Sequence, residues 1–371
     1  MLKKIKLLLL TALIVSCNSD ESGKSETADN FDREAMLENW ADNIIIPSFE
    51  NFSGETQSLS EAAVTFSEDP SEVNLVALRS AFEEAYLSYQ TVALFEVGEA
   101  EALDYHNFLN IYPVDATAVI AKAEANSFNL DLPASRDEQG FPALDFLING
   151  LGETDSEIVS FYTSENENAQ GYKNYLTSVA ERIDALTDTV LADWKNSYRD
   201  IFVSNTSSSS TGSVDKFTND YVMYFEMDLR SGKIGIPAGA FSGNPVPETA
   251  EAYYSEDFSK QLYLQALESF RNFFDGEHFN SSQTGPSYRQ YLEYLNSISE
   301  GEDIAAMINE QLDKVQEQAN ALNSDLAEQV RTDNSVMLGA FDELQKVVVL
   351  LKIDMLQALD ISVDYVDTDG D

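Results

Sequence analysis

The sequence has few of the residues that carry most metal and redox chemistry. It contains one cysteine, Cys17, and two histidines, His106 and His278, among 371 residues. A single cysteine excludes an intramolecular disulfide and a zinc site built on several cysteines. The two histidines do not form a His-Glu-x-x-His motif, so the usual sequence signature of a helical zinc-peptidase site is missing.

Basic residues are also scarce. The chain has 22 Lys and Arg residues against 65 Asp and Glu residues, for a formal net charge of −43. Nucleic acid is therefore excluded as a partner, because phosphate recognition requires a basic surface. An acidic surface favours solubility and attracts cations without specificity.

The N-terminus has the pattern of an export signal. A basic start is followed by an apolar run over 7–15, which is too short for a permanent membrane span and is typical of a secretory signal peptide. Cys17 follows a small residue in a pattern that resembles the bacterial lipobox. We therefore expect residues 1–16 to be a lipoprotein signal peptide and Cys17 to carry a lipid anchor in the bacterial outer membrane, with the periplasmic or surface side left open. Residues 17–30 are polar and are expected to form a disordered tether.

Helical periodicity dominates the rest of the chain. Apolar residues recur at steps of three and four in four long segments, as on the buried face of a helix. These residues are Leu75, Leu78, Phe82, Ala85 and Tyr89; Tyr172, Leu176, Val179, Ile183, Leu186 and Val190; Ile304, Ile308, Leu312, Val315, Ala319 and Leu322; and Met337, Phe341, Leu344, Val348, Leu351 and Met355. No segment alternates polar and apolar residues between short turns, so we predict an all-α fold of nearly antiparallel packed helices.

A serine-rich stretch at 204–213 divides the chain. It has the composition of a flexible linker or a long loop. We therefore predict an N-terminal helical bundle over 31–203 and a C-terminal helical bundle over 214–371. The similar sizes of the two halves favour an origin by duplication, although no aligned repeat is detected.

Residues 139–150 have the pattern of a short buried helix that contains one acid. Pro142 suits the first helical position, where an N–H is not needed, and Asn149 with Gly150 offers a left-handed exit. The helix is apolar on nearly every side, which indicates burial. Asp145 is the single carboxylate within it, so it requires a cation, a hydrogen-bond donor or a proton.

Two segments without helical periodicity, 95–115 and 230–243, are candidates for a functional site, because irregular segments commonly carry function. Their candidate residues are Asn110, Tyr112 and Asp115 in the first segment, and Arg230, Ser231 and Lys233 in the second. The Gly-Lys pair of the second segment is not followed by Ser or Thr, so a phosphate-binding P-loop is excluded.

Taken together, these segments resemble the imelysin family of bacterial envelope proteins. Residues 140–150 resemble the motif helix of that family, 109–115 its Asn-x-Tyr/Trp-Pro-x-Asp segment, 230–243 its second-half loop, and 352–371 its closing segment. The resemblance covers nearly the whole chain in family order. It implies two helical bundles with a site in the cleft between them, and a role tied to iron uptake or, in some members, metallopeptidase activity.

The chain departs from the family pattern at the motif helix. The family has Gly-x-His-x-x-Glu there, which places a histidine and a glutamate on one helical face for one metal ion. Pro142 and Asp145 occupy these two positions. Proline offers no donor atom to a metal, and a catalytic zinc usually needs three protein ligands, so we do not expect catalysis through this motif.

The partner of Asp145 has three interpretations. The favoured one is an ion pair with Arg230 or Lys233, whose disruption would cost about 3–5 kcal/mol if it is buried. In the second, Asp145 is one ligand of a hard cation, together with Asp115 and backbone carbonyls. In the third, Asp145 binds the polar head of a small ligand beside Tyr112.

The sequence therefore favours a non-catalytic imelysin-like envelope lipoprotein that binds a ligand, a metal or a partner at the cleft between the bundles. The cofactor is unknown, with iron or another divalent or trivalent cation as the candidate, and the expected partner is an outer-membrane iron or haem uptake system. One alternative is a metallopeptidase with a rearranged site that uses Asp145 and His106. Another is a scaffold subunit of the envelope.

Overall fold

The computed structural model describes residues 29–299 and 301–365, and this part of the chain contains helices and one isolated β-bridge but no strand. The prediction of an all-α fold is confirmed. The described residues from Phe31 onward form one compact unit. The predicted signal peptide and the lipidation site at Cys17 lie outside the described residues.

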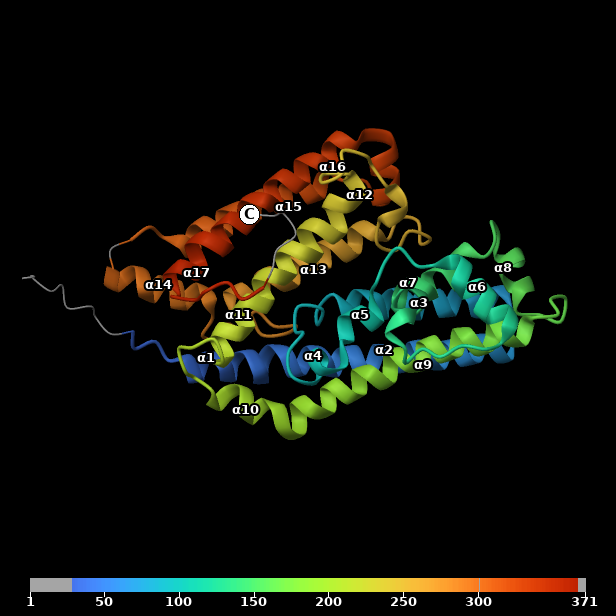
Figure 1. The fold of residues 1–371 in the computed structure, drawn as a ribbon, viewed down its shortest axis with the longest axis horizontal. Coiled ribbons are helices and arrows are strands. Elements are labelled where there is room, and N and C mark those ends of the chain that lie inside the picture. The colour runs from blue at the N-terminus through green and yellow to red at the C-terminus, as the bar shows by residue number, and fades with distance from the viewer. Residues whose placement is uncertain (1–28, 300, 366–371) are drawn as a thin grey trace, which may run out of the picture. The chain divides into compact units, whose positions relative to one another are not determined.

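The first half of the compact unit contains ten α-helices (Figure 1). Their bounds are α1 (Arg33–Asn39), α2 (Ile46–Glu68), α3 (Glu72–Tyr89), α4 (Glu99–Leu103), α5 (Tyr105–Leu109), α6 (Ala116–Ala125), α7 (Gly140–Asp145), α8 (Asp155–Phe161), α9 (Ala169–Asp193) and α10 (Arg199–Ser204). Wider π-helical turns continue three of them, namely η1 (Trp40–Ile45) after α1, η3 (Phe146–Gly150) after α7 and η4 (Trp194–Tyr198) after α9, and a short 3-10 segment, η2 (Pro133–Glu138), precedes α7.

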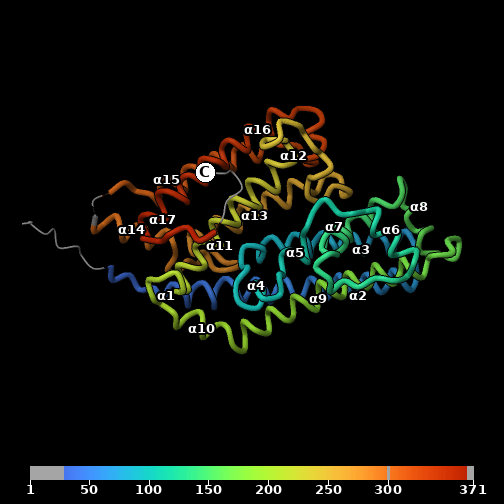
Figure 2. The backbone as a smooth tube through the Cα atoms, viewed as in Figure 1, coloured from blue at the N-terminus to red at the C-terminus, as the bar shows by residue number. Residues whose placement is uncertain are grey.

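The second half of the compact unit is also built of α-helices with π-helical and 3-10 segments between them (Figure 2). Its helices are α11 (Ser213–Tyr224), α12 (Ile236–Ala238), α13 (Ser259–Asp275), α14 (Tyr288–Ser299), α15 (Ile304–Ala321), α16 (Leu326–Val349) and α17 (Leu356–Ala358). The π-helical segment η5 (Phe225–Gly235) joins α11 to α12, the 3-10 turn η6 (Pro247–Thr249) precedes α13, and η7 (Leu350–Met355) joins α16 to α17.

The long helices pack through the stripes that periodicity predicts. Helix α2 lies against both α3 and α9 in the first half, while α16 packs on α15 and η5 in the second (Figure 1). Leu75 and Phe82 of α3, and Ile308 of α15, are fully buried in the core. Removing such side chains from water supplies most of the stabilisation of helices of this length.

Helix starts coincide with side chains that can satisfy free backbone N–H groups. Ser71 accepts from the backbone of Asn74 at the start of α3, and Thr154 forms a capping box with Glu157 at the start of α8. Asp303 caps α15 by accepting from the backbone N–H of Ala306. Such caps contribute about 1 kcal/mol each and explain why the helices begin at these residues.

Helix α7 differs from its predicted bounds. It begins at Gly140, two residues before the predicted start at Pro142, although Pro142 still lies in the first turn where a missing N–H breaks no helical bond. The predicted left-handed exit at Gly150 is wrong. The helix continues through η3, and the next residue, Leu151, has a φ of −76°.

Gly140 explains the earlier start of α7. Its φ is +72°, and a Cβ placed on it would lie 2.1 Å from the carbonyl oxygen of Leu109. Only glycine fits this combination of left-handed backbone and close approach. Gly140 therefore holds the start of α7 against the end of α5, directly beside Asn110.

None of the helices in the described ranges is long and apolar enough to cross a membrane. Helix α10 ends at Ser204 and α11 begins at Ser213, so the serine-rich stretch connects these two helices. The division into bundles at 31–203 and 214–371, and their origin by duplication, stay predictions.

We predict that Gly140→Ala destabilises the protein by about 2–4 kcal/mol, because it combines a strained left-handed residue with a clash against backbone. Gly54→Ala is the matched control, since Gly54 lies in α2 with no atom within 4 Å of an added Cβ. This control should stabilise the protein by about 0.5–1 kcal/mol. Urea denaturation of both variants measures the difference, and equal effects would contradict the role assigned to Gly140.

Candidate functional site

Asp145 is held by hydrogen bonds from both halves of the chain. Its side chain is 1% exposed. Its Oδ1 accepts from the Ser255 hydroxyl at 2.5 Å and from Asn149 Nδ2 at 3.1 Å, and its Oδ2 accepts from the backbone N–H of Tyr254 at 2.9 Å. The favoured prediction of an ion pair with Arg230 or Lys233 is therefore wrong, because neutral donors satisfy this carboxylate.

These contacts decide how Asp145 titrates. Burial raises the pKa of Asp145 to about 6, because a charged carboxylate loses hydration, and the hydrogen bonds from Ser255, Tyr254 and Asn149 oppose that increase. A carboxylate has about four lone-pair sites, and three of them are occupied here. Asp145 therefore has little capacity left to coordinate a metal ion.

A cavity of about 190 Å³ lies beside α7. Pro142 and Asp145 line it from the motif helix, and Tyr112 lines it from the loop after α5. Its other lining residues are Pro113, Val114, Glu248, Ala250, Ala252, Tyr253 and Tyr254. We call this space the α7 cavity. Its wall is largely aromatic and aliphatic and carries two carboxyl groups.

The hydroxyl of Tyr112 reaches toward η5. A Cβ at Gly232 would lie 3.1 Å from this oxygen, so the absence of a side chain at Gly232 leaves room for it. The nearby Tyr224 hydroxyl is buried and has no hydrogen-bond partner among the described residues. Burial, together with the charges of Asp228 and Glu251, raises the pKa of Tyr224 well above its usual value, so both phenols stay neutral donors.

Glu251 is the centre of a buried polar network beside this cavity. Its Oε1 accepts from Asn110 Nδ2 at 2.8 Å and from Gln90 Nε2 at 3.3 Å, and its Oε2 forms an ion pair with Lys233. Lys233 also donates to Gln90 Oε1 at 2.9 Å, and the Tyr86 hydroxyl donates to Asn110 Oδ1 at 2.5 Å. The network therefore joins α3 and the end of α5 to η5 and the segment after η6.

The Lys233–Glu251 pair is almost completely removed from water. The side chains are 4% and 1% exposed, respectively. A buried ion pair is stabilising only when further hydrogen bonds satisfy both ions, and Asn110 and Gln90 provide them here. The hydrogen bonds from Asn110 and Gln90 therefore make the position of Glu251 depend on both halves of the chain.

Arg230 and Ser231 belong to a different buried cluster. Arg230 lies 3.5 Å from Glu226 and sits over the rings of Phe241 and Phe341. The Ser231 hydroxyl donates to the Glu226 carbonyl at 2.8 Å. Neither residue lines the α7 cavity. The contact of Arg230 with Phe341 joins η5 to α16, while that of Ser231 lies within η5.

Asp115 is exposed and caps α6 by accepting from the backbone N–H of Ala118 at 2.9 Å. It does not line the α7 cavity. No group of three or more His, Cys, Asp or Glu side chains suited to a metal ion occurs in 29–299 or 301–365. The structure therefore does not bring Asp115 and Asp145 into such a ligand set.

His106 forms a further polar contact between the halves. Its Nε2 lies 3.1 Å from Asp228, and its Nδ1 lies 2.9 Å from the Tyr89 hydroxyl. Burial lowers the pKa of His106, but the charges of Asp228 and Glu96 outweigh burial and raise it to about 9. At neutral pH the imidazole is therefore protonated and engaged at both nitrogens, which makes it unavailable to a metal.

The predicted ligand-binding residues thus fall into separate environments. Tyr112 and Asp145 line the α7 cavity, while Asn110 and Lys233 belong to the Glu251 network behind it. The network residues missing from the prediction are Tyr86, Gln90 and Glu251, and the missing partners of Asp145 are Tyr254 and Ser255. Tyr86 and Gln90 lie on or beside a predicted helix, but no sequence pattern distinguishes Glu251 among the many acids.

The fold and the site together define an all-helical protein in which a motif helix borders a small cavity and a buried polar network. The family model named Imelysin matches residues 45–349. The chain therefore belongs to the imelysin family. No curated protein gives a significant match.

Two solved structures share the fold. An imelysin-like protein from Psychrobacter arcticum is 16% identical, with a TM-score of 0.69 over 90% of this chain and 97% of that one. A protein from Parabacteroides distasonis, proposed to be an iron-regulated protein A precursor, is 17% identical, with a TM-score of 0.69 over 88% of this chain and 96% of that one.

We predict that Lys233→Met destabilises the protein by about 3–5 kcal/mol, because Glu251 would remain as an uncompensated buried charge. Lys195→Met is the control, since Lys195 pairs with Glu50 while both side chains are about half exposed. Loss of an exposed pair costs about 1 kcal/mol or less. Chemical denaturation compares the variants, and the double variant Lys233→Met/Glu251→Leu should recover much of the loss. Similar losses for Lys233→Met and Lys195→Met would contradict the prediction.

We also predict a pH-dependent contribution from Asp145. A folded-state pKa of about 6, above the usual aspartate pKa of 3.8, gives a stabilising contribution that is complete below pH 3.8 and lost as pH rises through 6. Relative to Asp145→Asn, which does not titrate at this position, the wild type should therefore gain about 2–2.5 kcal/mol between pH 7 and pH 4. Denaturation of both proteins across this range measures the gain. A difference that does not change with pH would contradict it.

Proposed function

We propose that this protein is a non-catalytic envelope lipoprotein that binds a small ligand in the α7 cavity and acts in iron handling. The proposal rests on the two residues at the motif positions of α7, Pro142 and Asp145, because neither is suited to bind a metal ion. Pro142 offers no donor to a metal, and hydrogen bonds from Asn149, Tyr254 and Ser255 occupy three of the about four lone-pair sites of Asp145. Both residues line the cavity. Since they offer little to a metal ion that would activate water, the cavity is better suited to binding a ligand.

The lining favours a particular class of ligand. Tyr112, Tyr253 and Tyr254 offer aromatic faces, and Glu248 adds an exposed carboxylate at the same cavity. Since the protein provides few free metal-binding atoms there, iron bound at this site would arrive with its own ligands, as a small chelate. At about 190 Å³ the cavity is smaller than the range of about 300–1,000 Å³ that is usual for drug-sized ligands, which favours a small chelate over a haem.

Family membership and the Parabacteroides distasonis structure support the link to iron, because that protein is proposed to be iron-regulated. In this proposal Cys17 anchors the protein to the outer membrane, where it works beside an iron or haem uptake system. The metallopeptidase alternative is less well supported, since the nitrogens of His106 are engaged by Asp228 and Tyr89.

Calorimetric titration of the full chain with ferric tris(acetohydroxamate), haem, zinc and calcium tests the proposal. The first of these is an uncharged chelate, which suits a lining with two carboxyl groups and neither lysine nor arginine. We expect it to bind and Val114→Trp to abolish its binding, because Val114 lines the α7 cavity and the larger side chain fills it. Val73→Trp, at a position that is 78% exposed, is the control and should bind as the wild type does. Absence of binding by the uncharged ferric chelate would overturn the proposal, as would zinc binding with chelator-sensitive cleavage of peptides.

A further inference from the structure

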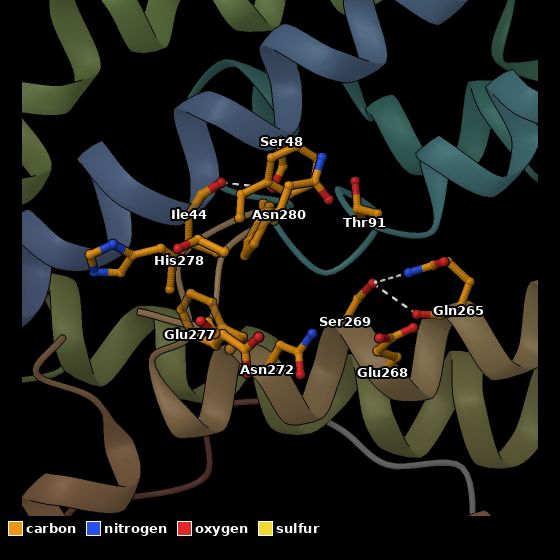
Figure 3. Close-up of a pocket in the computed structure, with 15 residues that line it drawn as sticks. Ile44, Ser48, Thr91, Gln265, Glu268, Ser269, Asn272, Glu277, His278 and Asn280 are labelled. Carbon is orange, nitrogen blue, oxygen red and sulfur yellow. Dashed lines mark hydrogen bonds between the residues drawn. The ribbon is translucent and has the colours of Figure 1, made fainter. Parts of the chain in front are cut away.

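A second and larger cavity of about 400 Å³ lies between α2 and α13 (Figure 3). It shares no lining residue with the α7 cavity. Ser48 of α2 and Thr91 of the turn after α3 line one side, and Asn272 of α13 lines the other. The loop over 277–282 completes it. We call this space the α13 cavity.

Several polar side chains of the α13 cavity have unused hydrogen-bonding capacity. The side chains of Glu268, Asn272, Glu277 and Asn280 make no hydrogen bond or ion pair with the part of the chain that the structure describes. In Figure 3, Glu268 and Asn272 lie on the α13 side and Asn280 lies across from them. Two amides and two carboxylates are therefore available to one ligand.

The loop that contributes Glu277 and Asn280 is tied to its surroundings by backbone hydrogen bonds. The N–H of Phe279 donates to the Asn43 carbonyl at 2.9 Å, which fixes the loop to η1. The N–H of His278 donates to the Gln283 carbonyl at 2.8 Å and closes the loop on itself. The cavity is therefore formed without a ligand, as small-molecule sites usually are.

The charge of the lining restricts the ligand. It includes Glu268 and Glu277 but neither lysine nor arginine, so an anionic ligand is disfavoured. The ring of His278 points away from the amides and carboxylates in Figure 3 and does not alter this balance. Carboxylates accept hydrogen bonds only, whereas amides both donate and accept. A matching ligand must therefore present groups that do both.

We propose that the α13 cavity binds a mono- or disaccharide. Each sugar hydroxyl donates to a carboxylate or an amide oxygen and accepts from an amide N–H, so it satisfies both kinds of free group. An amine cation would pair with Glu268 and Glu277 but leave the N–H groups of Asn272 and Asn280 unused. The half-buried ring of Phe279 provides an apolar face for the C–H side of a sugar ring. The volume lies within the range of about 300–1,000 Å³ of small-molecule sites.

Calorimetric titration of the full chain with glucose, galactose, N-acetylglucosamine, maltose and cellobiose tests this proposal. We expect at least one sugar to bind and Glu268→Gln/Asn272→Ala to weaken its binding about tenfold or more, because two hydrogen-bonding groups are changed. The double variant Glu310→Gln/Asn196→Ala carries the same substitutions at exposed positions and should bind as the wild type does.

Val114→Trp separates the two cavities, since it should leave sugar binding unchanged. Sugar binding that is lost in Val114→Trp would place the sugar in the α7 cavity and overturn the proposal. Binding of spermidine in place of every sugar would identify a site for amine cations instead. Failure of all five sugars to bind, or full binding by Glu268→Gln/Asn272→Ala, would also overturn it.

Discussion

The structure around the α7 cavity depends on one buried ion pair, between Lys233 and Glu251. Two charges this far from water are tolerable only if every remaining polar atom finds a partner, and those partners, Asn110 and Gln90, come from the other half of the chain. The segment that follows η6 is thereby held in place. The same segment presents the Tyr254 N–H and the Ser255 hydroxyl to Asp145. The hydrogen bonds of Asp145 in the motif helix therefore depend on the position of Glu251.

Two further polar contacts reinforce this junction. Asp145 joins α7 to Ser255, and His106 joins α5 to Asp228 of η5. Each connects residues that are more than a hundred positions apart in sequence. A change in the packing of η5 would therefore displace Lys233 and Asp228 together. The shape of the α7 cavity thus depends on all the polar contacts between the two halves of the chain.

The substitution of proline in the family motif changes what the motif helix does. A histidine and a glutamate at the two motif positions would both point at one metal ion. With Pro142 in the first turn and Asp145 hydrogen-bonded to Ser255 and Tyr254, the helix instead attaches the second half of the chain to the first. The carboxylate at the second motif position thus contributes to tertiary structure, and the adjoining cavity is left for a ligand.

The sequence by itself determined the helical fold, because apolar side chains at steps of three and four specify a buried face whatever the helix packs against. One of its three interpretations also placed Asp145 beside Tyr112, and both residues line the α7 cavity. The partner of Asp145 was decided only by the tertiary structure. With 65 acidic and 22 basic residues, many pairings are compatible with the sequence, and burial selects among them. Local pattern carries no information on which acid is buried, since Glu251 lies in an irregular segment and acquires its partners from residues distant along the chain.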